Sequence, residues 1–255
     1  MPTSVRRDGA LVARALRWRH ANRWIVDGID LIVRPGEIVG LLGPNGAGKT
    51  VTLSMMVGML RPTSGHVFID GVEITHLPLH KRARLGLAYL PQNRSVFTKL
   101  SAEDNIAAIL EARGMPKREM RARTVSLLES FGLSHVAKTK AARLSGGEQR
   151  RLEVARSLAI EPHFLLFDEP FAGIDPLTIE SLRSILLRLR ATGAGILITD
   201  HNVRATLTLC DRAVVLFNGR VLAEGTPAEL VANDAVRRHF LGDVLAVEDV
   251  GGEST

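Results

Sequence analysis

A motif whose glycines, lysine and threonine suit phosphate binding lies near the start of the chain. Its residues are Gly43, Pro44, Asn45, Gly46, Ala47, Gly48, Lys49 and Thr50. An apolar run at Ile38–Leu42 precedes it and a helical pattern at Gly48–Leu60 follows, which is the context that a phosphate-binding loop requires. Glycines let backbone N–H groups turn toward phosphate oxygens, and the start of the helix adds partial positive charge. We therefore expect Lys49 to reach the β- and γ-phosphates of a nucleotide and the Thr50 hydroxyl to ligate Mg²⁺.

Two adjacent acids, Asp168 and Glu169, follow the apolar run Phe164–Phe167. A buried strand that ends in neighbouring carboxylates indicates that something uses their charge, because burying an unpaired carboxylate is costly. Beside a phosphate-binding loop, Asp168 would hold Mg²⁺ through water and Glu169 would act as general base on the attacking water. The alternative is a strand end that simply meets solvent.

A second turn with anion-binding chemistry reads Leu144-Ser145-Gly146-Gly147-Glu148-Gln149. A serine hydroxyl, two glycines and the start of a helix suit a phosphate. Only one nucleotide loop is present in the chain, so this turn has no phosphate of its own. The simpler interpretation is that Ser145 only caps the helix.

Alternating strand and helix patterns position these motifs. Apolar, β-rich runs predict strands at 24–33, 38–42, 67–69, 87–90, 164–167, 195–199, 213–217 and 221–223. Helical spacing predicts helices after Gly48, over 103–133, and from Ser145 to Ile160. The alternation favours an α/β core with a mainly parallel sheet, into which a helical segment is inserted.

Bulk composition limits the class of protein. The chain has 255 residues, 45% of them hydrophobic, and a mean hydropathy of +0.10. No apolar run approaches the roughly 20 residues of a membrane-spanning helix, and no signal peptide is evident. The single cysteine, Cys210, excludes an internal disulfide and fits the reducing cytoplasm. A net charge of +6 is compatible with nucleic acid, anionic lipid or nucleotide and does not choose among them.

Taken together, the motifs resemble those of the ATP-binding cassette (ABC) ATPases over residues 10–242. The matching segments are Gly43–Thr50 (Walker A), Gln92 (Q-loop), Leu144–Gln149 (signature), Phe164–Glu169 (Walker B), Ala172–Asp175 (D-loop) and His201 (switch histidine). The resemblance implies an α/β P-loop NTPase (RecA-like) core at 10–92 and 160–242, with an antiparallel β subdomain and an inserted α-helical subdomain at 93–159. We expect residues 1–9 and the acidic tail 243–255 to be flexible.

The resemblance also implies roles for the site residues. Two copies would form a homodimer in which the signature turn of one copy closes over the Mg-ATP of the other. The nucleotide contacts from that turn would come from Ser145, Gly146, Gly147 and Gln149, and Asp175 would couple the two sites. Hydrolysis would use Glu169, His201 and Gln92, and the Mg²⁺ contacts would come from Thr50, Gln92 and Asp168.

Partners follow from the same resemblance. Separate transmembrane permease subunits would dock near Gln92–Leu100 and hold the chain on the cytoplasmic face of the inner or plasma membrane. No nucleic acid is expected, because DNA-repair relatives insert a long coiled coil between Q-loop and signature, and here no sustained heptads occur. A soluble ATPase acting on nucleic acid or ribosomes, and a nonhydrolysing switch, remain the competing functions.

Two positions depart from the family pattern. His20 stands where an aromatic residue usually stacks on adenine, and an imidazole offers less stacking area than a phenol ring. Trp18 is a second candidate, with core packing as its alternative role. Val51 stands where many relatives have a hydroxyl residue, so the backbone N–H alone would contact the α-phosphate.

A narrower resemblance rests on Tyr89–Gln92, Ser95–Phe97, Phe171–Pro176 and Thr199–Arg204. These segments resemble the ATPase subunits of lipopolysaccharide export transporters. The ATPases of branched-chain amino-acid importers are the alternative.

Three features receive only structural expectations. Met55, Met56 and Met59 are expected on one helix, in core packing. The basic run Lys81–Arg84 is expected on a solvated face. Cys210 is expected to be buried.

Overall fold

The computed structural model describes residues 9–93 and 95–242. Its element order begins with strands and ends with short helices, and the expected flexible ends fall on residues outside this range, Gly9 excepted. The strands are β1 (Leu11–His20), β2 (Arg23–Val33), β3 (Ile38–Leu42), β4 (Ser64–Ile69), β5 (Val72–Glu73), β6 (Leu87–Leu90), β7 (Phe164–Asp168), β8 (Gly195–Thr199), β9 (Arg212–Phe217) and β10 (Arg220–Gly225).

Helices connect and cover these strands. They are α1 (Lys49–Val57), α2 (Leu79–Arg84), α3 (Ala102–Ala112), α4 (Lys117–Ser130), α5 (Gly146–Leu158), α6 (Pro176–Ala191), α7 (Val203–Leu207), α8 (Pro227–Ala232) and α9 (Asp234–Val236), with 3₁₀ turns at Ser134–Val136 and Ala141–Arg143 and a π-helical turn at Arg237–Leu241. Asp175 caps α6 and Thr226 opens α8 in a capping box.

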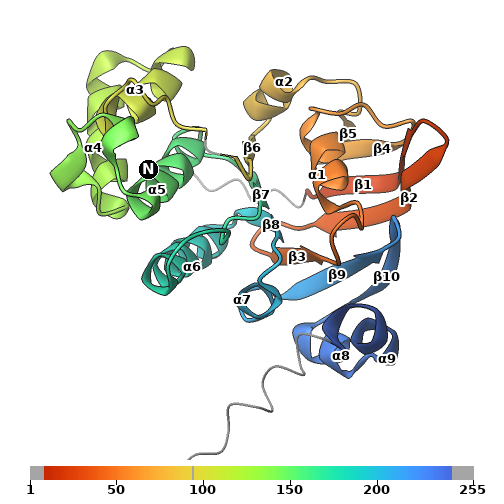
Figure 1. Ribbon diagram of the computed structural model, residues 1–255. Helices are drawn as coiled ribbons and strands as arrows, with labels where there is room; N and C mark the ends of the chain where they lie inside the picture. The colour runs from red at the N-terminus through yellow and green to blue at the C-terminus, as the bar shows by residue number, and fades with distance from the viewer. Residues whose placement is uncertain (1–8, 94, 243–255) are drawn as a thin grey trace, which may run out of the picture.

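A six-stranded sheet in the order β10-β9-β3-β8-β7-β6 forms the centre of the molecule (Figure 1). Its pairs are parallel except for β10 with β9. Because helices cover both of its faces, its inner strands read as continuous apolar runs rather than as alternating ones. The mainly parallel α/β core expected from the sequence is therefore confirmed.

Side chains of each parallel strand alternate between two apolar clusters. Ile38 of β3 and Leu165 of β7 join the cluster that contains α5 and α6. Val39 of β3 and Leu166 of β7 join the other cluster, which contains α1. This alternation fixes the register, because a shift of one residue would exchange the two faces.

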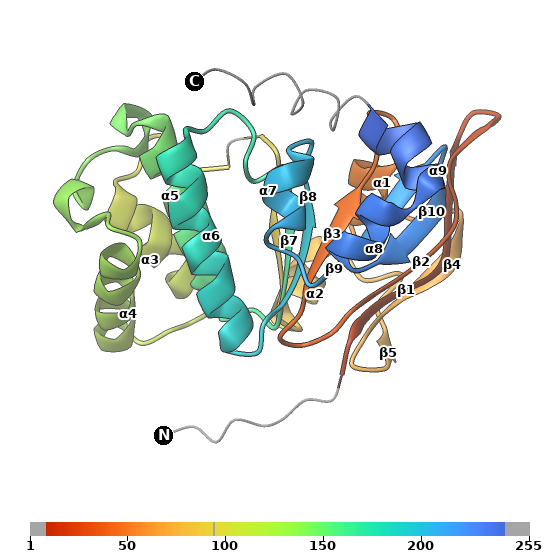
Figure 2. The same cartoon turned by 90° about the horizontal axis from the view of Figure 1, so that it is seen from below.

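A second sheet, in the order β2-β1-β4-β5, is antiparallel and lies beyond α1 (Figure 2). The helical segment α3, α4 and α5 lies on the opposite side of the central sheet (Figures 1 and 2). Its apolar residues Ile106 and Leu127 share one cluster with Ile196 of the central sheet. The inserted helices are thus packed on the core rather than built as a separate unit.

The basic run on α2 corrects one expectation. Lys81 and Arg84 are exposed, but Arg82 is only 1% exposed. Its guanidinium donates to the carbonyl oxygens of Met55, Met56, Thr75 and Leu77, at 2.6 to 2.8 Å. Burial lowers the pKa of Arg82 to about 10. The prediction of a wholly solvated face was wrong because the carbonyls at the end of α1 attract a cation.

The methionine expectation is confirmed in part. Met55 and Met56 are fully buried on α1, whereas Met59 lies beyond the helix end and is 60% exposed. Gly58 ends α1 with a positive φ of 83°, which turns the chain away before Met59. Cys210 is buried, as expected.

Candidate functional site

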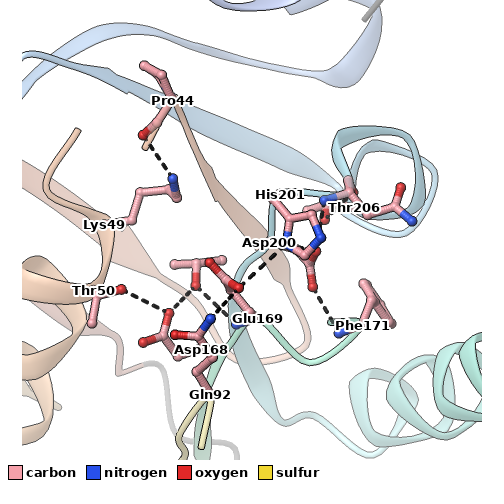
Figure 3. A network of polar contacts seen from close by, with 12 residues as sticks. Pro44, Lys49, Thr50, Gln92, Asp168, Glu169, Phe171, Asp200, His201 and Thr206 are labelled. Carbon is pink, nitrogen blue, oxygen red and sulfur yellow. Dashed lines mark hydrogen bonds and ion pairs between the residues drawn. The ribbon is translucent and has the colours of Figure 1, made fainter. Parts of the chain in front are cut away.

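The residues predicted to bind and hydrolyse the nucleotide lie together at the carboxyl ends of four neighbouring parallel strands. The phosphate-binding loop follows β3, the two acids end β7, His201 follows β8, and Gln92 follows β6. In open α/β sheets this edge is where ligands bind, because the strand order brings loops of distant sequence together there. Figure 3 shows these side chains turned toward one another.

Glycines are required at two points of the loop for steric reasons. A Cβ on Gly43 would lie 2.3 Å from the carbonyl oxygen of Leu216, and one on Gly48 would lie 2.8 Å from that of Ile25. Both residues also have positive φ values, 143° and 101°. The loop can therefore fold close to the neighbouring strands only without side chains at these positions.

Helix α1 begins directly after Gly48 and has no side-chain cap on its first N–H groups. Lys49 is 8% exposed, and its ammonium group donates to the carbonyl oxygens of Gly43 at 2.6 Å and Pro44 at 3.1 Å. Burial lowers the pKa of Lys49, and the nearby Glu169, Asp168 and Asp200 oppose this shift. The ammonium group therefore lies within the Gly43–Thr50 loop. A phosphate bound there would contact both this group and the backbone N–H groups of the loop.

Asp168 is 2% exposed at the end of β7. Its Oδ1 accepts hydrogen bonds from Thr199 Oγ1 at 2.6 Å and Thr50 Oγ1 at 3.3 Å. Burial, and to a smaller extent Asp168, raise the pKa of Tyr89 to about 12. A threonine hydroxyl and a carboxylate beside a phosphate loop are oxygen ligands of the kind that Mg²⁺ prefers, so these residues fit the ion.

Glu169 connects the next two functional side chains. Its Oε2 accepts a hydrogen bond from Gln92 Nε2 at 2.7 Å and lies 3.4 Å from His201 Nδ1 (Figure 3). The backbone of Glu169 has a φ of 48°, in the left-handed region, and its N–H donates to Thr199 O at 2.8 Å. Side chains from the ends of β6 and β8 thus converge on the carboxylate at the end of β7, whose backbone conformation is stabilised by a hydrogen bond to β8.

Comparison with known proteins agrees with this geometry. The family description "ABC transporter" matches residues 26–172. A lipopolysaccharide export system ATP-binding protein LptB of Acidithiobacillus ferridurans is 50% identical over 93% of this chain and 98% of its own length. The protein of the same name from Escherichia coli K12 is 47% identical over 91% of this chain and 97% of its own length. The chain belongs to the ABC transporter ATP-binding family. It is a nucleotide-binding ATPase subunit.

Solved structures of the family share the fold. The ATP-binding subunit of an ABC transporter, 30% identical, superposes with a TM-score of 0.80 over 94% of this chain and 98% of that one. An ATP-binding cassette in its ADP conformation, 24% identical, gives a TM-score of 0.82 over 92% and 99%. Among the described residues of this ABC ATPase, no helix has both the length and the apolar character needed to cross a bilayer.

The signature turn of this ABC ATPase lies apart from the convergent site. Helix α5, which it opens, is on the far side of the central sheet from α1 in both views (Figures 1 and 2). Ser145 caps α5 in a capping box: its hydroxyl donates to Glu148 Oε2 at 2.7 Å, and its N–H donates to the same oxygen at 2.8 Å. These hydrogen bonds lower the pKa of Glu148. The simple capping role of Ser145 is therefore real in the single chain.

Two other signature residues, Gly147 and Gln149, contact different parts of the structure. A Cβ on Gly147 would lie 2.7 Å from Thr178 Oγ1, and Thr178 is also bonded to Asp175. The structure thus brings the signature turn against the D-loop and the start of α6. Gln149, in contrast, is buried, and its amide donates to the carbonyl oxygens of Ala141 and Leu144 at 3.0 Å. The Gln149 side chain therefore stabilises the turn from its buried side, whereas Glu148 is partly exposed.

The two adenine candidates lie on one face of the β1–β2 hairpin. Their rings are stacked, with centroids 6.0 Å apart and planes at 25°. His20 is exposed, whereas Trp18 is partly buried against the cluster that contains α1 and Val51. The core-packing alternative for Trp18 therefore has structural support, and His20 has the freer ring.

Some residues of the site were not singled out from the sequence. Thr199 holds Asp168, and Arg150 of α5 donates to the carbonyl oxygens of Glu169 at 3.3 Å and Pro170 at 3.2 Å. Arg150 also pairs with Glu153 at 2.9 Å, and Glu153 accepts a hydrogen bond from the N–H of Ser95. A polar residue at a strand end was the only sequence signal for Thr199. For Arg150 and Glu153 the signal was the i, i+3 spacing of opposite charges.

Proposed function

We propose that this chain hydrolyses Mg-ATP at the Gly43–Thr50 loop and drives separate transmembrane subunits, as the ATPase of a lipopolysaccharide exporter. The convergence of Gln92 and His201 on the Glu169 carboxylate is the observation that supports hydrolysis most directly. A general base must lie within reach of its water and be oriented by its neighbours, and this carboxylate has two such neighbours.

Each residue then has a distinct role. Lys49 and the N–H groups of residues 43 and 45–51 hold the phosphates, since Pro44 has none, and the exposed ring of His20 stacks on adenine. Thr50, Asp168 and Gln92 would hold Mg²⁺, which would compensate the charge of the β- and γ-phosphates. Glu169 accepts a proton from the attacking water. His201 lies beside the γ-phosphate and orients that water, because its Nε2 accepts one of the hydrogen bonds of the water.

The separation of the two anion-binding turns supports homodimerisation. Ser145, Gly146 and Gly147 are too far from the chain's own loop to share its phosphate, as α1 and α5 lie on opposite sides of the sheet (Figures 1 and 2). In a two-fold dimer each signature turn closes over the nucleotide of the other copy. Asp175, which adjoins the signature turn through Thr178 and Gly147, then lies at the interface and couples the two sites.

Transmembrane subunits dock at the segment after Gln92, up to Leu100. Phe97 in this segment is 45% exposed. The guanidinium carbon of Arg156 lies over its ring, 4.4 Å from the ring centroid. The segment is connected to Glu153 of α5 through Ser95, so docking and the catalytic residues share contacts. The chain would therefore be held on the cytoplasmic face of the inner membrane by its partners.

Lipopolysaccharide as the transported molecule rests on the relatives. Proteins so named match at 45–50% identity over at least 91% of this chain. A second candidate has one specific observation in its favour: residues 220–246 match the description "Branched-chain amino acid ATP-binding cassette transporter". That match is confined to residues 220–246, so it supports a shared ancestry of the C-terminal part more than it supports amino-acid transport by the whole chain.

Isolation of the chain with its membrane partner tests the assignment. An epitope-tagged chain is purified in detergent from membranes of its source organism, and bound proteins and lipids are identified by mass spectrometry. We expect transmembrane subunits in fixed stoichiometry together with lipid A-containing glycolipid. Recovery with an amino-acid permease supports the second candidate, and recovery with ribosomes or nucleic acid contradicts both.

A further inference from the structure

Asp200 is a buried carboxylate between β8 and His201 that none of the roles above uses. It is 0% exposed. Its Oδ2 accepts a hydrogen bond from Phe171 N at 2.9 Å, and its Oδ1 accepts one from Asn202 N at 2.8 Å. Phe171 lies two residues after Glu169, and Asn202 lies directly after His201. One side chain therefore joins the two backbone segments that carry the base and the switch histidine (Figure 3).

An ionised Asp200 carboxylate destabilises the folded state, because it is buried. Burial raises the pKa of Asp200, and the two backbone N–H groups only partly offset the shift. An ionised carboxylate can accept from both N–H groups at once, whereas an amide of the same shape has one acceptor oxygen and one donor. The two-sided contact with Phe171 and Asn202 therefore requires the acid, despite its cost.

The same carboxylate lies beside the His201 ring. His201 Nδ1 is 3.5 Å from Asp200 Oδ1 and 3.4 Å from Glu169 Oε2. Carboxylates on this side favour a proton on Nδ1 and direct Nε2 away from both acids. Because the His201 side chain is 59% exposed, packing alone does not fix its ring.

We propose that Asp200 is a positioning residue for ATP hydrolysis, which holds the His201 loop and the segment after Glu169 at a fixed separation and keeps the proton of His201 on Nδ1. This inference rests on the proposed roles of Glu169 and His201. A bridge of this kind acts on the geometry of the reacting groups. Toward the phosphate-binding loop, which follows another strand, Asp200 contributes only the smallest of the charge effects on the pKa of Lys49.

Asp200→Asn in the full-length chain is the test. It keeps the shape and removes one acceptor. We expect kcat to fall about 10- to 100-fold, as misplacement of catalytic groups by about 1 Å does, while the ATP KM and the Kd from calorimetry change less than about twofold. In ¹⁵N NMR of the imidazole, the fraction of His201 in the Nδ1–H form should fall, although Glu169 still lies 3.4 Å from Nδ1.

Asp211→Asn is the matched control. Asp211 also accepts a backbone N–H at a strand end of the same sheet, from Ile38 at 2.9 Å, but it pairs with Arg190 away from the site. It should lower the unfolding temperature without a loss of kcat. Equal kcat loss in the two variants would show that Asp200 contributes only to stability and would overturn the inference.

Two further measurements keep the outcomes distinct. Glu169→Gln and His201→Ala are assayed in parallel: if these retain the wild-type rate, the proposed roles of those two residues are wrong. If they lose activity and Asp200→Asn does not, only the present inference is overturned. Should Asp200→Asn not fold, the wild-type NMR spectrum decides, because a neutral His201 with its proton on Nε2 contradicts the bridge.

Discussion

The two anion-binding turns of this chain, the Gly43–Thr50 loop and the Leu144–Gly147 turn, are built in opposite ways. Helix α1 after the loop has no side-chain cap, so its first N–H groups are left for a ligand. Helix α5 has a complete capping box, in which Ser145 and Glu148 satisfy each other. The first turn is thus prepared to bind, whereas the second is satisfied within its own chain until something displaces Glu148.

The two helices are also anchored differently. The C-terminal carbonyls of α1 are held by Arg82, which is only 1% exposed. Helix α5 is instead anchored by Arg150 and Glu153 to the segments that leave β6 and β7. The loop therefore belongs to a rigid core, and the signature turn belongs to an element that is connected to the hydrolysis residues. A closed site needs both, from two copies of the chain.

Loss of the general base should have the largest effect. Glu169→Gln keeps a hydrogen-bond partner for Gln92 and His201 but cannot accept a proton. We expect kcat to fall about 10²- to 10⁴-fold in a phosphate-release assay. Binding of ATP, measured by calorimetry, should persist, because the loop is untouched. A wild-type rate for this variant would show that another group activates the water.

Disruption of the signature turn should abolish closure while sparing the loop. Ser145→Arg destroys the capping box and places a bulky cation where a partner's phosphate must approach. In a Glu169→Gln background, ATP should dimerise chains with an intact signature but leave Ser145→Arg chains monomeric, as measured by light scattering. Both should bind one ATP per chain.

Mixing variants sharpens the same comparison. Lys49→Ala removes the cation from the loop and should weaken ATP binding itself. Mixed with Ser145→Arg, it forms a dimer in which one composite site has both turns intact and the other has neither. Some ATPase activity should return. Dimers of Ser145→Arg chains with ATP would show that the signature does not meet a partner's nucleotide.

Replacement of Arg82 tests how much its contacts with the end of α1 contribute to the free energy of unfolding. Arg82→Ala removes the guanidinium donor from four carbonyl oxygens, and the bonds to Met55, Met56 and Thr75 are buried ones. We expect a loss of about 3 kcal/mol in the free energy of unfolding, measured by urea denaturation. Arg84→Ala, on the exposed face of the same helix, is the control and should change the stability by less than about 0.5 kcal/mol.

How far the sequence predicts the structure depends on whether the determinants are local. Strands β3, β6 and β8 agree with the prediction at both ends, because buried parallel strands are short apolar runs between glycines and polar residues. Strand β1 was not predicted: its pairing is interrupted by bulges and by Ala15 at a φ of 47°, which break the alternation of apolar residues. The fold class and the family are confirmed, and the residue roles remain predictions.

Tertiary contacts account for the rest. Nothing in the basic sequence of α2 shows that the carbonyls of α1 lie against Arg82. In the same way, Gln149 and Glu148 are neighbours in the motif, but only the helix geometry decides that Gln149 faces inward. Side-chain direction depends on the exact start of α5, and a helix start is the least predictable feature of a helix.

The smallest effect is expected at His20, the residue proposed to stack on adenine. His20 is exposed at the end of β1 and stacks on Trp18, so its ring is held but is not part of the core. Adenine stacking contributes similarly to the ground state and the transition state, and His20→Ala should therefore raise the ATP KM about two- to fivefold and leave kcat unchanged. His20→Tyr, which enlarges the stacking area, should lower the KM. If His20→Ala leaves the KM for ATP at the wild-type value, the base stacks elsewhere, and Trp18 becomes the residue to replace next.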